Sequence, residues 1–136
     1  MKTIVVTAAV VERDGAFLVT RRLEGTHLAG AWEFPGGKCE LNEPLEACLW
    51  REIREELGAR CSVGPEIFSI THEYPDRRVE LHFFSCTLLD DPTPLLGQEM
   101  QWVPRSQLTE LQFPPADDEL IRRLAQIPDS RLRIGD

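Results

Sequence analysis

Hydrophobic and polar positions along this chain follow two different periods, and each change of period marks an expected element. Residues 3–12 and 16–23 form two runs rich in small, branched and apolar side chains, separated by the turn sequence Arg-Asp-Gly. Two apolar runs joined by such a turn predict a β-hairpin. Because the first run is apolar at almost every position, we expect its strand to be covered on both faces.

Three more strands are predicted in the second half of the chain, over residues 59–74, 77–89 and 100–103. The first two are joined by a Pro-Asp turn. Apolar and polar side chains alternate around Leu81 in the second of them. This alternation is typical of a strand that turns one face toward a core.

Two helices are predicted, over residues 44–57 and 117–126. The first begins at a proline and stops before Gly58, and these residues favour the two ends of a helix. The apolar face of the second helix is formed by Leu120, Ile121, Leu124 and Ile127. Residues 24–43 are left as a long glycine-rich connection, and a connection of that length inside one domain is usually functional.

These elements fit one domain at residues 1–128, followed by a loose tail at residues 129–136, and their mixture indicates an α/β (α+β) fold. A chain of 136 residues can bury one core of its own. No apolar run approaches the ~20 residues that cross a bilayer. The N-terminal run meets Glu12 and Arg13 without the cleavage site of a signal peptide. We therefore expect no membrane partner.

The charge and the cysteines narrow the function classes further. A formal net charge of −8 argues against binding to nucleic acid polymers. A small anionic substrate remains compatible with that charge if a metal ion or a local basic patch offsets the repulsion. The four cysteines include no Cys-x-x-Cys pair, which favours reduced thiols in a cytoplasmic protein. A monomer and a homodimer both remain open.

The predicted helix at residues 44–57 carries its acidic side chains on one arc. With about 100° per residue, its apolar side chains define one buried stripe, made of Leu49, Ile53 and Leu57. Glu52, Glu55 and Glu56 share an arc of about 100° beside that stripe. Like charges at this spacing cost a helix only a few tenths of a kcal/mol each. A solvated charged face is therefore one explanation of the pattern.

The other explanation is a metal site. Several glutamates on one rigid face offer the hard oxygen ligands that Mg²⁺ and Mn²⁺ prefer. The double glycine at residues 36–37 allows the backbone to come close to a ligand. A glycine carbonyl is then a further candidate ligand.

The spacing of these residues favours the metal site. Gly37 is followed after five residues by Glu43, and after seven more by Arg-Glu-Ile-Arg-Glu-Glu-Leu-Gly-Ala over residues 51–59. This spacing matches G-x5-E-x7-R-E-U-x-E-E-x-G-U, the Nudix box, in which U is a bulky aliphatic residue; Ala59 is small for the last place. With "TRR", "WEFPGGK", "EYPDR" and "FPPAD", the similarity runs from residue 3 to residue 127. The chain thus resembles the MutT branch of the Nudix hydrolases, bacterial nucleoside triphosphate pyrophosphohydrolases.

The resemblance implies a fold and a reaction. The fold is a mixed β-sheet sandwiched between α-helices. The reaction is attack of water on the β-phosphorus of a nucleoside triphosphate, which gives a nucleoside monophosphate and pyrophosphate. The cofactor implied is Mg²⁺, with Mn²⁺ as the alternative. The metal ligands implied are Glu52, Glu55, Glu56 and the carbonyl of Gly36. The catalytic set is Glu52 as general base, Arg51 as the residue that orients it, and Glu55; we expect Glu43 to support the junction between loop and helix.

Phosphate and base contacts are expected from residues outside the box. Neighbouring side chains in a strand point to opposite faces, so the adjacent arginines at 21 and 22 cannot both serve one ligand. The matching family position favours Arg22, with Arg77 as second choice and Lys38 as a further candidate. Arg78 is expected to be a surface charge.

Aromatic side chains are the candidates for contact with the nucleobase. Tyr74, Phe34 and His27 offer faces on which a base can stack, at about 1–3 kcal/mol per base. For Phe34 a place in the buried core is an equally good explanation. His27 has an exposed loop position as its alternative.

Asp117 stands where MutT proteins carry an asparagine. An ionised aspartate only accepts hydrogen bonds, which favours an exocyclic amine such as that of cytosine. A protonated aspartate, with its pKa raised by burial, could also donate and read 8-oxoguanine. Capping the last helix is the alternative role.

One departure concerns the number of metal ions. MutT proteins often place another metal-binding glutamate where this chain has Leu96, and Glu99 is the nearest carboxylate. We expect 8-oxo-dGTP as substrate, with CTP or modified dCTP as the alternative. Nucleotide sugars, dinucleotides and a regulatory Nudix module without turnover are more remote alternatives.

Overall fold

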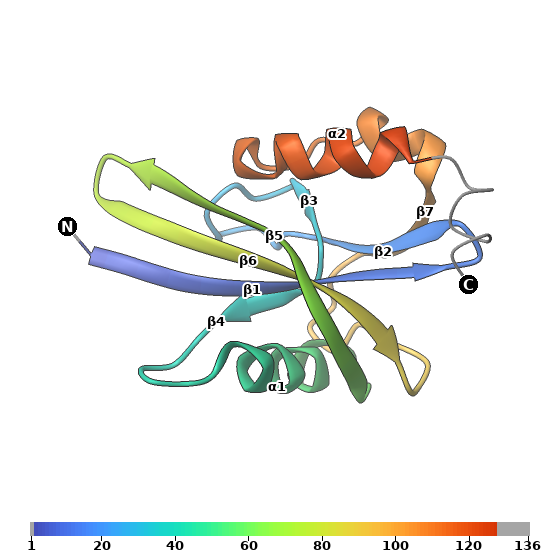
Figure 1. The fold of residues 1–136 in the computed structure, drawn as a ribbon, viewed down its shortest axis with the longest axis horizontal. Coiled ribbons are helices and arrows are strands. Elements are labelled where there is room, and N and C mark those ends of the chain that lie inside the picture. The colour runs from blue at the N-terminus through green and yellow to red at the C-terminus, as the bar shows by residue number, and fades with distance from the viewer. Residues whose placement is uncertain (1, 128–136) are drawn as a thin grey trace.

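The computed structural model describes residues 2–127 (Figure 1), so the predicted tail lies outside the described residues. In chain order the elements are β1 (Lys2–Arg13), β2 (Ala16–Arg21), β3 (Trp32–Glu33), β4 (Gly36–Lys38), α1 (Leu45–Leu57), β5 (Cys61–Tyr74), β6 (Arg77–Leu88), β7 (Met100–Pro104) and α2 (Asp118–Gln126). Two short 3₁₀ segments, η1 (Arg105–Glu110) and η2 (Pro115–Asp117), precede α2. Among these residues, no helix is long and apolar enough to cross a membrane.

β1 lies at the centre of the sheet. It pairs in parallel with β6 from Lys2 to Val11 and antiparallel with β4, while its last two residues pair with β2. The strand order is β3-β2-β1-β6-β5, with β4 added to β1 and β7 to β2. The predicted hairpin is confirmed, and its turn places Asp14 and Gly15 at φ 53° and 78°, the two positive angles of a type I′ turn.

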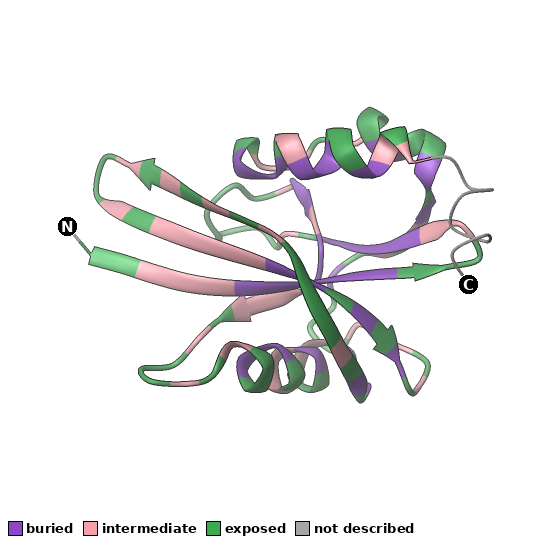
Figure 2. Ribbon diagram, in the orientation of Figure 1, coloured by how far each residue is buried: buried purple, intermediate pink, exposed green. Residues whose placement is uncertain are grey.

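The two faces of β1 contribute to two separate cores, as its continuous apolar run predicts. Ala8 and Val10 belong to the core under α2, whereas Ala9 and Val11 belong to the core under α1. Figure 1 shows α2 on one side of the sheet and α1 on the other, and Figure 2 shows the buried positions between them. The mixed sheet between helices is therefore confirmed.

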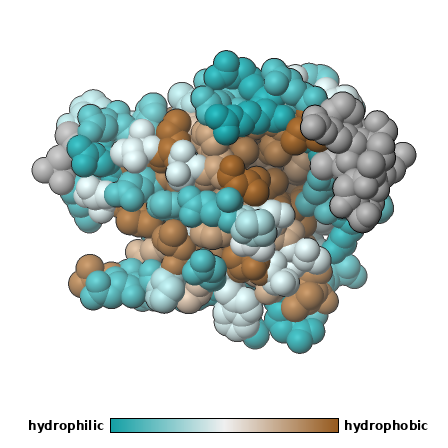
Figure 3. Space-filling model, viewed as in Figure 1, coloured by the Kyte–Doolittle hydropathy of each residue, from teal (hydrophilic) through white to brown (hydrophobic). Residues whose placement is uncertain are grey.

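α2 turns its apolar face to the first core and its charged face outward. Leu120, Ile121 and Leu124 are buried, whereas Arg122 and Arg123 are exposed. Figure 3 shows a hydrophilic surface over this helix. The predicted face is confirmed for these three residues, whereas Ile127 lies just past the helix and is half-buried. The helix begins one residue later than expected.

The predicted connection at residues 24–43 was not a loop throughout. It contains β3 and β4, which are two and three residues long. Their pairing with β2 and β1 depends on contacts distant in sequence, which a local pattern of two or three residues does not reveal. β2 also ends at Arg21, two residues earlier than predicted.

α1 has the ends that its sequence predicts. Pro44 precedes its first turn, and Gly58 ends it in the left-handed conformation at φ 61°. The segment before β7 then holds the end of this helix, because the Thr93 and Leu95 N–H groups donate to the carbonyls of Leu57 and Glu56. The carboxylate face of α1 is thereby fixed relative to β7.

Candidate active site

Glu52 lies against the double glycine. A methyl group on Gly37 would come within 2.4 Å of the Glu52 carboxyl carbon, so the carboxylate occupies the space that a side chain at residue 37 would need. The Glu52 side chain is only 15% exposed, whereas that of Glu55 is 60% exposed. The glycine thus makes room for one inward-facing carboxylate of α1.

Gly36 serves a different purpose. A methyl group there would meet the Thr7 carbonyl oxygen at 2.0 Å, which means that β1 and β4 approach too closely for any side chain. The Ala9 N–H donates to the Pro35 carbonyl, and the Cys39 N–H donates to the Val5 carbonyl. Odd-numbered residues therefore make the hydrogen bonds between these two segments. By alternation, the Gly36 carbonyl points away from β1 and is free to act as a ligand.

Arg51 joins the loop to the helix. Its Nε and Nη2 donate to the two carboxylate oxygens of Glu43, both at 2.9 Å, and Nη2 also donates to the Lys38 carbonyl at 3.1 Å. Its Nη1 lies 3.4 Å from Glu52 and 3.3 Å from Glu55. Hydrogen bonds from Arg51 hold the pKa of Glu43 at about 2. Glu43 is therefore a permanent anion that positions Arg51 beside Glu52.

Glu56 carries the most perturbed carboxyl on α1. Burial, and then the neighbouring carboxyls of Glu52, Glu33 and Glu55, raise its pKa to about 8. Burial also raises the pKa of Glu52, against the opposing effect of Arg51. Glu52 and Glu56 are thus harder to ionise than ordinary carboxyls while no cation is bound, and a divalent cation with oxygen ligands fits this donor set.

The three carboxylates of α1 do not converge on a point in this structure. Within residues 2–127, the group whose three ligand atoms lie within 4.8 Å of one another is Cys39, Glu43 and Cys48 instead. Arg51 draws Glu52 and Glu55 to itself, and like charges at this spacing repel. A shared cation would require the glutamates to rotate toward the Gly36 carbonyl.

A cavity of about 690 Å³ opens beside this face, a size typical of small-molecule sites. All seven predicted substrate residues line it: Arg22, His27, Phe34, Lys38, Tyr74, Arg77 and Asp117. Gly36 and Glu56 line it as well. Residues from segments that are distant in sequence therefore meet around one space next to the carboxylates.

Glu33 is a cavity residue that the sequence analysis missed. Its carboxylate pairs with Arg22 at 2.9 Å, and burial raises its pKa against the opposing effect of Arg22. The adjacent Arg21 also lines the cavity, contrary to the expected separation of the two arginines, but its guanidinium pairs with Glu99 at 3.3 Å. Glu99 is thus occupied outside the cavity lining and does not replace the missing glutamate.

Leu96, at the place of the extra glutamate, contributes an apolar side chain to the cavity lining. Its neighbour Gln98 is buried, and the Gln98 side chain accepts from the Leu96 N–H and donates to the Glu56 carbonyl. The Gln98 side-chain amide therefore links the loop before β7 to α1, close to the position where MutT proteins often carry the additional glutamate.

The aromatic candidates occupy two different environments. Tyr74 and His27 form an edge-to-face pair at 4.9 Å, with Arg77 about 6 Å above the Tyr74 ring. Phe34 is buried and stacks on Phe113 at 5.5 Å. Phe34 thus belongs to the core and also lines the cavity, so both of its predicted roles are compatible with its position.

Two further basic side chains separate as expected. The Nε of Arg77 is buried without a hydrogen-bond partner among residues 2–127, with Asp76 3.7 Å away. Arg78 instead pairs on the surface with Glu73 at 2.8 Å. Arg77 therefore lines the cavity, whereas Arg78 is a surface charge.

Asp117 does not cap α2, because its side chain makes no capping hydrogen bond. The residue is only 4% exposed and lines the cavity. Burial, and then repulsion from Glu33 and Asp118, raise its pKa to about 7. The carboxyl is therefore poised between a neutral donor and an anionic acceptor near neutral pH.

Comparison with known proteins supports the resemblance seen in the sequence. A family model described as the NUDIX domain matches residues 6–123. The 8-oxo-dGTP diphosphatase of Haemophilus influenzae is 36% identical over 126 residues, which cover 90% of this chain and 92% of that protein. The CTP pyrophosphohydrolase of Escherichia coli is 35% identical over 134 residues, 96% of this chain and 98% of that protein.

A solved structure agrees with this assignment. The solution structure of the E. coli ORF135 protein matches with a TM-score of 0.79 at 34% identity, covering 96% of this chain and 94% of that chain. Ala59, at the last aliphatic place of the box, is buried. The chain belongs to the NUDIX family and is a hydrolase of that family.

Proposed function

We propose that this chain is a Mg²⁺-dependent pyrophosphohydrolase that converts 8-oxo-dGTP and water into 8-oxo-dGMP and pyrophosphate, and so removes oxidised nucleotides from the nucleotide pool. One observation carries this proposal. The acidic face of α1 adjoins a cavity that combines basic side chains, aromatic faces and a carboxyl with a pKa of about 7. Phosphates, a purine ring and a lactam edge each find complementary groups there.

The metal and the water are assigned to the face of α1. Glu52, Glu55, Glu56 and the Gly36 carbonyl would hold Mg²⁺, which screens phosphate charge and makes water more acidic when bound. Glu52 accepts the proton of the attacking water. Arg51 holds Glu52 in place while Glu43 holds Arg51.

The remaining phosphate charge is assigned to the basic cavity residues. Arg22 directly follows β2, Arg77 begins β6 and Lys38 directly follows the double glycine, and all three line the cavity. Arg22, which pairs with Glu33 in this structure, would also form a charge-assisted hydrogen bond to a phosphate oxygen.

The base is assigned to the far end of the cavity. Tyr74 stacks on the purine, with His27 beside it and Phe34 at the floor. Neutral Asp117 both donates and accepts, and it therefore pairs with the adjacent carbonyl and N–H of 8-oxoguanine. Ionised Asp117 only accepts, which favours the amine of cytosine and makes CTP the second candidate.

The ratio of kcat/KM for 8-oxo-dGTP to that for CTP tests this assignment. At about pH 6 Asp117 is mostly protonated and the ratio exceeds one. As the pH rises through about 7, Asp117 loses its proton, and the ratio falls roughly tenfold, because one buried donor is lost. Comparing two substrates at each pH cancels the pH dependence of the shared chemical step.

The matched variant is Asp117→Asn, whose amide donates and accepts at every pH. Its ratio stays above one and does not change between about pH 6 and about pH 8. A wild-type kcat/KM for CTP above that for 8-oxo-dGTP at about pH 6 would replace the proposed substrate. A ratio in the variant that still falls with pH would remove Asp117 as its cause.

A further inference from the structure

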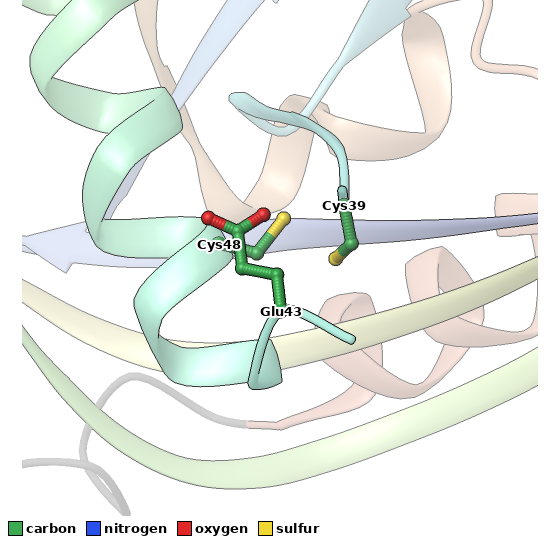
Figure 4. Close-up of side chains that lie close together, drawn as sticks. All are labelled: Cys39, Glu43 and Cys48. Carbon is green, nitrogen blue, oxygen red and sulfur yellow. The ribbon is translucent and has the colours of Figure 1, made fainter. Parts of the chain in front are cut away.

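A second cluster of ligand atoms lies at the junction between β4 and α1. The sulfur atoms of Cys39 and Cys48 and one carboxylate oxygen of Glu43 all lie within 4.8 Å of one another. Figure 4 shows Cys39 on the segment that follows β4, opposite the first turns of α1, with Glu43 and Cys48 side by side. Three residues from one ten-residue stretch thus present a mixed sulfur and oxygen donor set.

The cluster is anchored on one side and accessible on the other. Cys48 is buried, and the hydroxyl of the buried Thr7 donates to its sulfur at 3.3 Å. Cys39 and Glu43 are partly exposed, and Leu41 between them is 92% exposed. An ion can therefore reach the cluster from the loop side, while Cys48 supplies a fixed ligand at the base.

We propose that Cys39, Glu43 and Cys48 form a site for a thiophilic divalent cation such as Zn²⁺ or Cd²⁺, separate from the Mg²⁺ site, and that its occupation inhibits the enzyme. Thiolates select soft and borderline cations, whereas Mg²⁺ requires oxygen ligands. Three protein ligands and one water complete a tetrahedral site. On binding, each thiol releases its proton to solvent, so the cation gains two thiolates and one carboxylate.

Inhibition follows from the position of Glu43. Both of its carboxylate oxygens hold Arg51, each at 2.9 Å. A cation drawn to the two sulfurs takes one of these oxygens, because a carboxylate binds Zn²⁺ at about 2.0–2.2 Å. Arg51 then loses one of its two hydrogen bonds to Glu43 and turns toward Glu52 and Glu55, whose carboxylates it already contacts. This inhibitory part rests on the proposed function, whereas binding of the cation does not.

Binding is measured by titrating Cd²⁺ into the protein at saturating Mg²⁺ and recording the ultraviolet charge-transfer absorption of cadmium thiolates. One equivalent is expected to produce the band in the wild type. Cys39→Ser is expected to weaken binding by more than the 10–100-fold typical of losing only an outer partner of a metal ligand. The matched control is Cys61→Ala, because Cys61 and Cys86 are the other neighbouring thiol pair, each changing the pKa of the other.

The cadmium titration distinguishes the proposed site from binding at the other pair of thiols. A band that survives in Cys61→Ala and disappears in Cys39→Ser supports the site. No band in the wild type, or a band lost only in Cys61→Ala, overturns it. Circular dichroism of Cys39→Ser checks that the variant is folded, and Cys39→Ala provides a second loss of the ligand.

Turnover is measured separately, with Zn²⁺ added at saturating Mg²⁺. Zn²⁺ is expected to reduce kcat of the wild type and of Cys61→Ala, and to leave Cys39→Ser active. Equal inhibition of the wild type and Cys39→Ser contradicts the inhibitory role, because Zn²⁺ then acts at the carboxylate face. Failure of the proposed substrate leaves the cadmium band intact, so the two proposals fail independently.

Discussion

Replacing Glu52 by glutamine is expected to lower kcat about 10²–10⁴-fold, the contribution of a positioned general base. The amide has nearly the same shape as the carboxylate, so it still fits beside Gly37, but it cannot accept the proton of water. The rate of pyrophosphate release from 8-oxo-dGTP measures the loss, and thermal unfolding measures the fold.

Glu46→Gln is the matched control, because Glu46 is an exposed glutamate in the first turn of the same helix. Its kcat is expected to equal that of the wild type. If Glu52→Gln retained the wild-type rate, Glu52 would not be the base. If the wild type bound the nucleotide without turnover, the chain would be a regulatory module instead.

The two glycines before α1 are expected to respond differently to alanine. In Gly37→Ala the new methyl group meets the end of the Glu52 side chain, at 2.4 Å from its carboxyl carbon. The side chain can rotate away, so the free energy of unfolding changes little. The displaced base is expected to reduce kcat by about 10²-fold, because a misplacement of about 1 Å has that effect.

In Gly36→Ala the methyl group meets backbone instead, at 2.0 Å from the Thr7 carbonyl oxygen. β1 cannot rotate away, so the free energy of unfolding is expected to fall by about 3 kcal/mol, the upper end of the usual cost of overpacking. Urea denaturation and kcat, measured on both variants, distinguish them. A stable Gly36→Ala, or a fully active Gly37→Ala, would contradict the roles assigned to these glycines.

α1 could be predicted from the sequence because local chemistry determines both its ends and its faces. Pro44 and Gly58 set the ends, and helical spacing separates the buried Leu49 and Ile53 from the acidic arc. The double coverage of β1 was predictable for a similar reason. A strand with no polar face must have a core on each side.

The pairing of the strands was not predictable in this way. β1 runs parallel to β6, which lies more than 60 residues later in the chain, and no turn sequence records such a contact. Glu33 was missed for the same reason, because its contact with Arg22 depends on the register of β3 against β2. The available signal was its position three residues before the double glycine.

The sequence left the burial of Asp117 as one of two alternatives. Asp117 follows two prolines and precedes a helix, a pattern that predicts a cap, yet its carboxyl faces the cavity. The cluster of Cys39, Glu43 and Cys48 was missed because its members are separated by a loop that folds back on α1. In both cases the tertiary fold brings together groups whose sequence spacing is unremarkable.

The proposal that water attacks the β-phosphorus of 8-oxo-dGTP is tested most directly by hydrolysis in water enriched in oxygen-18, with Mg²⁺ present. Mass spectrometry of the products locates the label. We expect it in pyrophosphate, with none in 8-oxo-dGMP. Label in the nucleoside monophosphate, or release of orthophosphate as the first product, would contradict the mechanism assigned to the face of α1.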